Sequence, residues 1–431
     1  MKISRRNLLK SASAGAAASL LPPRLQESAP TQKSSSNSQL PAAFSKLLPI
    51  EDRIHPITVD EFKARVIQAQ KLMTDSKPPL AALYLTGGSS LYYFTGLRWG
   101  LSERLAAVVI PRSGDLLAVC PAFEEGRFRE SLRWPVEVRT WQEDESPYAV
   151  IAQWFADRGI RTGAVGIEET TKYVFFDGLR QAAHGLTYAS GDPITHICRS
   201  RKSAHELELM RLACSATFDV YRAVFASLQA GMTQFDVARL VSQGFERMGL
   251  EGGALVLFGE WAARPHGTRQ PQKLEEGQVV LIDGGTSVDG YQSDVTRCSV
   301  IGKPPDKLLK SFDILRRAQD AALAAAVAGH ECGSVDDAAR GIVVDAGFGL
   351  GYKYFTHRLG HGIGLDGHEW PYLVRGSKII MQPGMTFSNE PGIYIPGDYG
   401  LRLEDDMVIS DSGPAQLLTP GFCPFLETPI A

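Results

Sequence analysis

The stretch 281–297, LIDGGTSVDGYQSDVTR, constrains the fold of this chain more than any other part of the sequence. It continues an apolar run, 279–282, that predicts a buried strand ending at Asp283. Glycines separate it from a second run, 291–300, which carries its own acid, Asp294. Two short strands joined through glycines predict a β-hairpin in which each strand presents one carboxylate.

A carboxylate at the end of a buried strand is unfavourable unless a positive charge meets it. A single aspartate there would usually cap a turn, but downstream segments supply possible partners. The segment 356–369, THRLGHGIGLDGHE, contains His361. The segments SNEPG and RLEDD contain Glu390 and Glu404, which end and begin apolar runs and so repeat the two-carboxylate layout of the hairpin.

These two Asp, two Glu and one His form a mixed oxygen and nitrogen set suited to two divalent ions. Four clustered carboxylates would repel one another and would not all stay ionised without metal, whereas two divalent cations would neutralise them. The sequence therefore predicts a two-metal site. Carboxylate-rich ligation favours manganese, with cobalt or zinc as alternatives.

The order and context of these residues resemble the superfamily of methionine aminopeptidase, prolidase and aminopeptidase P. The matching features are the Asp283/Asp294 spacing and the blocks GHGIG (360–364), NEPG (389–392) and RLEDD (402–406). The resemblance is strong from Ile197 onward and weaker over 81–123. It implies an α+β protein, in which a pita-bread catalytic domain follows a smaller α/β creatinase-like N-terminal domain.

The resemblance also assigns roles to the clustered residues. It implies that Asp283, Asp294, His361, Glu390 and Glu404 bind the metal ions, with Asp294 and Glu404 bridging them. A bridging hydroxide would attack the scissile carbonyl. Glu390 is the candidate general base because a ligand carboxylate touches the water to be deprotonated; the alternative is a ligand with no proton role.

Three further histidines, His266, His357 and His368, resemble the non-ligand histidines of the family. We expect them to contact the substrate carbonyl, the developing oxyanion or the leaving nitrogen, with His266 and His368 also binding substrate. Arg402 lies two residues before Glu404. It would either hold a substrate carboxylate or orient a metal ligand.

The chain divides into four predicted regions. Residues 1–30 contain SRRNLLK and an apolar run too short to span a bilayer, and they resemble a twin-arginine export signal. Residues 31–47 are a polar linker. Residues 48–196 form the N-terminal domain, in which no catalytic constellation is apparent, and residues 197–431 form the catalytic domain.

The prolidase and aminopeptidase P branch is favoured by the GHGIG and HEWP blocks and by the separate N-terminal domain. The predicted activity is hydrolysis of the bond between an N-terminal residue and proline, in a dipeptide or a longer peptide. A site that polarises the carbonyl with metal avoids the missing N–H and fixed ring of proline. Three alternatives stay open at this point: a metal-dependent lyase, another non-peptidase hydrolase, and a non-catalytic peptide-binding relative.

The charge argues against nucleic acid and membrane partners, and the cysteine spacing argues against a disulfide framework. The formal charge of −3, with both signs interspersed, gives no footprint for nucleic acid, and we expect no stable membrane insertion. The six cysteines contain no C-x-x-C pair and predict buried thiols. The family implies a homodimer or higher homo-oligomer, and the signal predicts a periplasmic or otherwise extracytoplasmic location.

Overall fold

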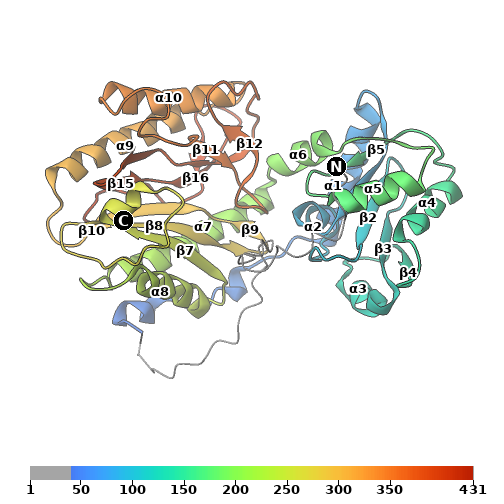
Figure 1. Ribbon diagram of the computed structural model, residues 1–431, viewed down its shortest axis with the longest axis horizontal. Helices are drawn as coiled ribbons and strands as arrows, with labels where there is room; N and C mark the ends of the chain where they lie inside the picture. Colours follow the sequence, from blue (N-terminus) through green and yellow to red (C-terminus); the bar gives the residue numbers. More distant parts are fainter. Residues whose placement is uncertain (1–39, 431) are drawn as a thin grey trace, which may run out of the picture. The chain divides into compact units, whose positions relative to one another are not determined.

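The computed structural model describes residues 40–430 (Figure 1). The predicted export signal, 1–30, and most of the predicted linker lie outside these residues. The remaining part of that linker includes a short 3-10 helix, η2 (Ala42–Lys46), in which Phe44 is buried. The backbone N–H of Ile50 donates to the carbonyl of Met248, so this segment packs on the catalytic domain.

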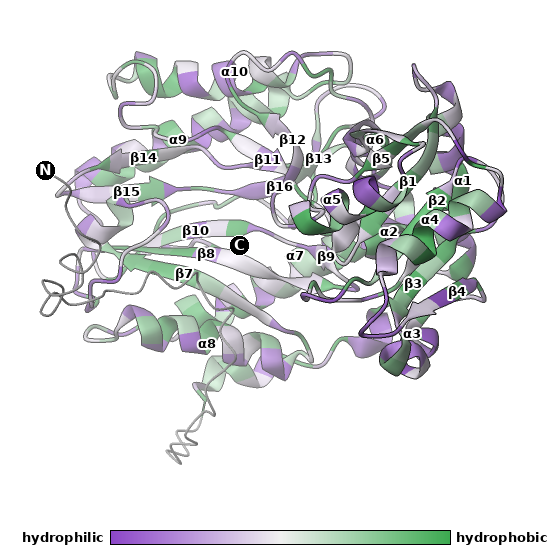
Figure 2. Cartoon of the chain, turned by 45° about the vertical axis from the view of Figure 1, so that its right-hand side comes forward, coloured by the Kyte–Doolittle hydropathy of each residue, from purple (hydrophilic) through white to green (hydrophobic). Residues whose placement is uncertain are grey.

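The N-terminal domain is built on one mixed sheet of strand order β4-β3-β2-β1-β5-β6. Its strands are β1 (Leu80–Thr86), β2 (Ala107–Pro111), β3 (Leu117–Pro121), β4 (Glu137–Trp141), β5 (Ala164–Ile167) and β6 (Thr187–Ser190). Its helices are α1 (Val59–Asp75), α2 (Ser89–Thr95), α3 (Glu125–Ser131), α4 (Pro147–Asp157), α5 (Tyr173–Ala182) and α6 (Asp192–Ser200). The central strands are hydrophobic along their length, which confirms the expected α/β domain (Figure 2).

The catalytic domain contains two larger antiparallel sheets enclosed by helices, and a separate two-stranded sheet, β14-β15. The first has the order β10-β8-β7, and the second has the order β12-β11-β13-β16-β17. The helices are α7 (Ala204–Phe225), α8 (Gln234–Arg247), α9 (Asp306–Ala325) and α10 (Cys332–Asp345). The strands are β7 (Gly252–Phe258), β8 (Val279–Val288), β9 (Tyr291–Gln292), β10 (Val295–Val300), β11 (Gly360–Gly362), β12 (Glu369–Leu373), β13 (Thr386–Asn389), β14 (Gly392–Ile395), β15 (Tyr399–Arg402), β16 (Asp405–Val408) and β17 (Gln416–Leu417).

The four helices of this domain lie on opposite sides of its strands. Helices α9 and α10 cover one side, and α7 and α8 cover the other (Figure 1). Capping boxes at Ser203 and Thr233 begin α7 and α8, because each hydroxyl accepts from a backbone N–H three residues on. This arrangement is the expected pita-bread catalytic domain.

The predicted hairpin is present, but one of its boundaries was wrong. β8 does not end at Asp283; it continues to Val288, and Asp283 pairs with Thr296 of β10. Gly284 and Gly285, which were predicted to interrupt the strand, lie inside it. They are needed there because neighbouring segments of the backbone approach closely. A Cβ on Gly284 would lie 2.3 Å from the Gly253 oxygen, and one on Gly285 would lie 2.1 Å from the Ser293 oxygen.

Two predictions about the rest of the chain can be compared with the described residues. All six cysteines are free and buried, as predicted from their scattered spacing. Within residues 40–430, no helix combines the length and the apolarity needed to cross a membrane.

Candidate metal centre and active site

The five predicted metal ligands converge from the two sheets of the catalytic domain. Asp283 lies within β8, and Asp294 immediately precedes β10. His361 is the middle residue of β11, Glu390 follows β13, and Glu404 precedes β16. Each antiparallel pair, β8/β10 and β13/β16, therefore contributes two carboxylates, and β11 adds the imidazole.

Their ligand atoms are close enough to share ions. The groups Asp283–Asp294–Glu404 and His361–Glu390–Glu404 each place one ligand atom per residue within 4.8 Å of the others. His361 Nε2 lies 3.3 Å from Glu390 Oε1 and 4.0 Å from Asp294 Oδ2. Glu404 belongs to both groups, which suits a carboxylate that bridges two ions.

The orientation of His361 favours ligation through Nε2. Its Nδ1 lies 3.1 Å from the Gly362 carbonyl oxygen, an acceptor, so Nδ1 carries the proton and Nε2 keeps its lone pair. The backbone N–H of His361 donates to Ser388 Oγ at 3.0 Å, and the Ser388 hydroxyl donates to Glu390 Oε1 at 3.3 Å. Burial, reinforced by the neighbouring His368, lowers the pKa of His361 to about 3, so the imidazole is neutral.

The carboxylates carry more negative charge than the protein compensates. Burial and the surrounding acids raise the pKa of Asp294 and of Glu404 well above the ordinary range. Burial, with Asp283 adding to it, raises the pKa of Glu390 to about 8. The donor types, the spacing and this excess charge all fit bound divalent cations.

Asp283 differs from the other acids because it has a cation beside it. Arg402 Nη2 donates to Asp283 Oδ2, and Thr296 Oγ1 lies 2.6 Å from Oδ1. Although burial acts to raise it, the pKa of Asp283 is lowered because Arg402 and these hydrogen bonds outweigh the desolvation. The side chain of Arg402 is 4% exposed and also donates to Tyr394 Oη and the Pro265 oxygen. Of the two roles considered for Arg402, its contacts match the orientation of a metal ligand.

The three non-ligand histidines occupy different environments. His357 is held at both nitrogens: Nδ1 lies 2.7 Å from the Arg358 oxygen, and Nε2 lies 2.8 Å from Tyr394 Oη. Burial, with the nearby Arg402, lowers the pKa of His357 to about 3. His266 is exposed in the loop after the 3-10 helix η5 (Gly259–Ala263).

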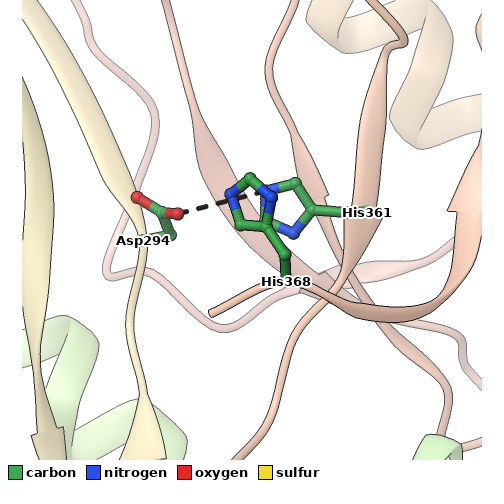
Figure 3. A group of neighbouring side chains, drawn as sticks. All are labelled: Asp294, His361 and His368. Carbon is green, nitrogen blue, oxygen red and sulfur yellow. Dashed lines mark ion pairs between the residues drawn. The ribbon is translucent and has the colours of Figure 1, made fainter. Parts of the chain in front are cut away.

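His368 is also exposed, and its ring stacks on that of His361, with centroids 3.7 Å apart (Figure 3). Burial of part of the ring, with Arg358 and His266 adding to it, lowers the pKa of His368. Asp294, His361 and His368 also lie within 4.8 Å by their ligand atoms, so His368 is near enough to face either an ion or a substrate held beside it.

Several residues that hold the ligands were not predicted from the sequence. Thr296 contacts both Asp283 and Glu404, and Asp406 Oδ2 accepts the backbone N–H of Asp294 at 3.0 Å. Thr296 follows Asp294 by two residues in a strand context, so the alternation of side chains was a usable signal. Tyr394 gives no comparable signal, because its contacts with His357 and Arg402 depend on the tertiary fold.

Comparisons with known proteins agree with the fold. Residues 208–411 match metallopeptidase family M24, and residues 65–201 match the creatinase/prolidase N-terminal domain. The probable dipeptidase PepE of Mycobacterium tuberculosis is 35% identical over 339 residues, covering 78% of this chain and 88% of that protein. The Xaa-Pro dipeptidase of Lactobacillus helveticus is 32% identical over 353 residues, covering 80% and 94%.

Solved structures give the same result. The crystal structure of dipeptidase PepE from Mycobacterium ulcerans has a TM-score of 0.78 and 32% identity, covering 85% of this chain and 98% of that one. A recombinant prolidase from Thermococcus sibiricus has a TM-score of 0.76 and 29% identity, covering 84% and 97%.

Proposed function

Because the chain belongs to metallopeptidase family M24, we propose that it cleaves the peptide bond between an N-terminal residue and proline, with Xaa-Pro dipeptides as its preferred substrates. The single observation that carries this proposal is the convergence of Asp283, Asp294, His361, Glu390 and Glu404 within ligand distance. The preference for dipeptides is supported by the names of the relatives, which include dipeptidases and Xaa-Pro dipeptidases.

Two divalent ions, with manganese favoured by the carboxylate-rich set, would polarise the substrate carbonyl and lower the pKa of the attacking water. The residues of the chain hold and orient the reacting groups. The Glu390 carboxylate accepts the proton of that water. Glu390 Oε2 lies 3.8 Å from His357 Nδ1. The hydrogen bond from Tyr394 fixes the His357 ring, and His357 in turn limits the movement of Glu390.

His368 and His266 face the substrate in this proposal. Both rings are exposed, and neither makes a hydrogen bond within the described part of the chain. An imidazole with free nitrogens can donate a hydrogen bond to the oxyanion or to the leaving proline nitrogen. Arg402 orients Asp283 and does not need to contact the substrate.

The test is turnover of Xaa-Pro dipeptides, Xaa-Pro-Yaa tripeptides and matched dipeptides without proline after loading the purified protein with manganese, cobalt or zinc. We expect Xaa-Pro dipeptides to be cleaved fastest and close to two ions to bind per chain. Asp294→Asn should lose both metal and activity. A metal-loaded protein that cleaves none of these peptides, or one that retains no ion, would overturn the proposal.

Turnover of His368→Ala separates a substrate role from ligation. If His368 contacts the substrate, metal content stays near normal and turnover falls by about 10²–10⁴, the range for a lost acid or base. Loss of metal together with activity would instead make His368 a ligand. Circular dichroism serves as the control for folding.

We propose that the chain is exported by the twin-arginine pathway, on the basis of SRRNLLK and the following apolar run in residues 4–21. Replacing Arg5 and Arg6 by lysine should leave the protein in the cytoplasm, and unchanged export would contradict the assignment. A homodimer or higher homo-oligomer stays a prediction, which sedimentation of the purified protein would test.

A further inference from the structure

The short segment that carries His368 connects β11 to β12 and is held from outside the metal centre. Among residues 40–430 the His368 ring makes no hydrogen bond, and its ring contact is the stack on His361. An imidazole that must meet a substrate atom needs a fixed position, because catalysis by a positioned group depends on its geometry. The position of this ring therefore depends on how its backbone is held.

Arg199, at the end of α6, ties the two ends of this segment together. Its Nη2 atom donates to Asp366 Oδ2 at 2.6 Å and to Glu369 Oε2 at 2.6 Å. Asp366 precedes His368 by two residues, and Glu369 follows it directly. One guanidinium nitrogen of the N-terminal domain thus contacts both flanks of His368, and α2 adds a hydrogen bond from Ser89 Oγ to Asp366.

Lys202 completes the hold on Glu369. Its Nζ donates to Glu369 Oε1 at 2.6 Å, so the two oxygens of Glu369 face two different cations. The side chains of Lys202, Glu369 and Arg199 are 2%, 7% and 9% exposed. The packing is tight, since a Cβ on Gly364 would lie 2.6 Å from Glu369 Oε1 and 2.7 Å from Lys202 Cε.

The charges of this cluster balance, because two cations meet the two carboxylates of Asp366 and Glu369. Burying three of these four charges is a poor way to gain stability, since desolvation offsets most of the attraction. A buried cluster of this kind does fix geometry, because each hydrogen bond has a defined direction. Its location around His368 points to a role in the reaction.

We propose that Arg199, assisted by Lys202, is a positioning residue that holds the segment 366–369 so that the His368 imidazole faces the substrate. This inference rests on the proposed function, because it takes His368 as a substrate contact. Within residues 40–430 the hydrogen bonds of Arg199 go to Ser90, Asp366 and Glu369 and not to a metal ligand, so it acts on the reaction through His368.

The experiment is a double-mutant cycle on turnover of an Xaa-Pro dipeptide. Arg199→Lys keeps the charge but loses the planar guanidinium, whose Nη1 donates to Ser90 Oγ at 3.1 Å and so directs Nη2 at both carboxylates. We expect turnover per metal-loaded enzyme to fall by up to about 10²-fold, the scale on which small misplacements act, with metal content unchanged. In the His368→Ala background the same change should cost less than about twofold, because the residue through which it acts is gone.

The matched control is Arg65→Lys. Arg65 is also a buried arginine of the N-terminal domain, and it pairs with Glu206 of α7 at 3.2 Å, away from the His368 segment. If the arginines only dock the two domains, both lysine variants should behave alike. We expect Arg65→Lys to retain near-normal turnover. If Arg199→Lys does not fold by circular dichroism, Asp366→Asn replaces it, because Asp366 is 42% exposed and loses one side of the same hold.

A second readout does not depend on activity. In metal-free protein, the His368 ring proton signal, identified by its loss in His368→Ala, should shift in Arg199→Lys and stay in place in Arg65→Lys. An unmoved signal, or losses that add fully in the double variant, would overturn the positioning role. Turnover that survives His368→Ala would overturn this inference while leaving Xaa-Pro hydrolysis standing. A wild-type protein without Xaa-Pro turnover would overturn the proposed function, and the signal shift would still report whether Arg199 positions His368.

Discussion

The Thr296 hydroxyl lies 2.6 Å from Asp283 Oδ1 and 2.5 Å from Glu404 Oε2, and it accepts from Arg402 Nε at 3.1 Å. A hydroxyl has one proton to donate, so it satisfies one of two ionised carboxylates at a time. In the metal-free protein the second contact needs a proton on the other acid, in agreement with the raised pKa of Glu404. Thr296 therefore holds the two acids close together, which is where a shared ion would bind.

Replacing Thr296 by valine keeps the shape of the side chain and removes its hydrogen bonds to the two ligands. We expect metal affinity to fall by about 10–100-fold, the usual effect of losing a group that orients metal ligands. Competition with a chelator measures this affinity. Thr296→Ser keeps the hydroxyl and is the control; equal affinity in the valine and serine variants would contradict the role.

The Tyr394 hydroxyl orients two residues, His357 and Arg402, that lie next to the metal ligands. Arg402 donates to it at 3.0 Å, so its own proton points to His357 Nε2. Tyr394→Phe should lower turnover by about tenfold, equivalent to one lost hydrogen bond of about 1 kcal/mol or somewhat more, with metal content unchanged. Tyr399→Phe, on the neighbouring strand, is the matched control because its hydroxyl contacts the remote Ser311. A similar loss in both variants would point to disruption of the β14–β15 hairpin.

Among the helices and strands, the apolar runs and glycines of the sequence predicted which segments carry the metal ligands. They did not predict how the side chains that contact those ligands pack. The hairpin with Asp283 and Asp294 followed from a local pattern, two apolar runs separated by glycines. The strand end at Asp283 was misplaced because glycines that permit close approach look like glycines that turn a chain. The contact of Arg199 with Glu369 joins two domains, and no local pattern encodes it.

The first turns of α1 and α7 meet through a pair that titrates. His205 Nδ1 lies 2.9 Å from Glu61 Oε1, and Nε2 lies 2.8 Å from the His55 oxygen. Both partners are acceptors, so both ring nitrogens must carry protons and the imidazolium is the favoured form. Burial lowers the pKa of His205, but the hydrogen bonds to Glu61 and His55 and the charges of Glu61 and Glu208 together raise it above 6.5.

This pair predicts a pH-dependent contribution to stability. Because the folded-state pKa is raised, the contribution is fully present below the unfolded pKa of about 6.5 and is lost as the pH rises through the folded-state value. His205→Gln should therefore lower the free energy of unfolding more at about pH 6 than at about pH 8.5. Urea unfolding of metal-free protein measures it. His184→Gln, an exposed position, is the control, and an equal effect of His205→Gln at both pH values would contradict the prediction.

The acids that would bind the metal ions lower the stability of the metal-free protein. Four carboxylates meet between the two sheets with Arg402 as the cation paired to Asp283, and burial disfavours their charged forms. In the metal-free protein these acids oppose folding at neutral pH, because desolvation and mutual repulsion raise the pKa values of Asp294 and Glu404 and charge or proton uptake is then unfavourable. Bound divalent cations would make the contribution of these acids to stability favourable. The stability of the protein should therefore increase with metal loading.

Asp294→Asn tests this directly, since it keeps the shape and removes an acid that must take up a proton, or stay charged beside other acids, when the metal-free protein folds. The metal-free variant should melt at a higher temperature than the metal-free wild type, because the amide has no unfavourable ionisation or proton uptake on folding. Manganese should raise the melting temperature of the wild type, with about 2.7 kcal/mol gained at a free concentration 100 times the dissociation constant, and should barely affect the variant. Asp345→Asn removes an exposed charge on α10 and controls for net charge alone. If metal-free Asp294→Asn is less stable than wild type, the acids are compensated by contacts within the protein and the centre is not held under electrostatic strain.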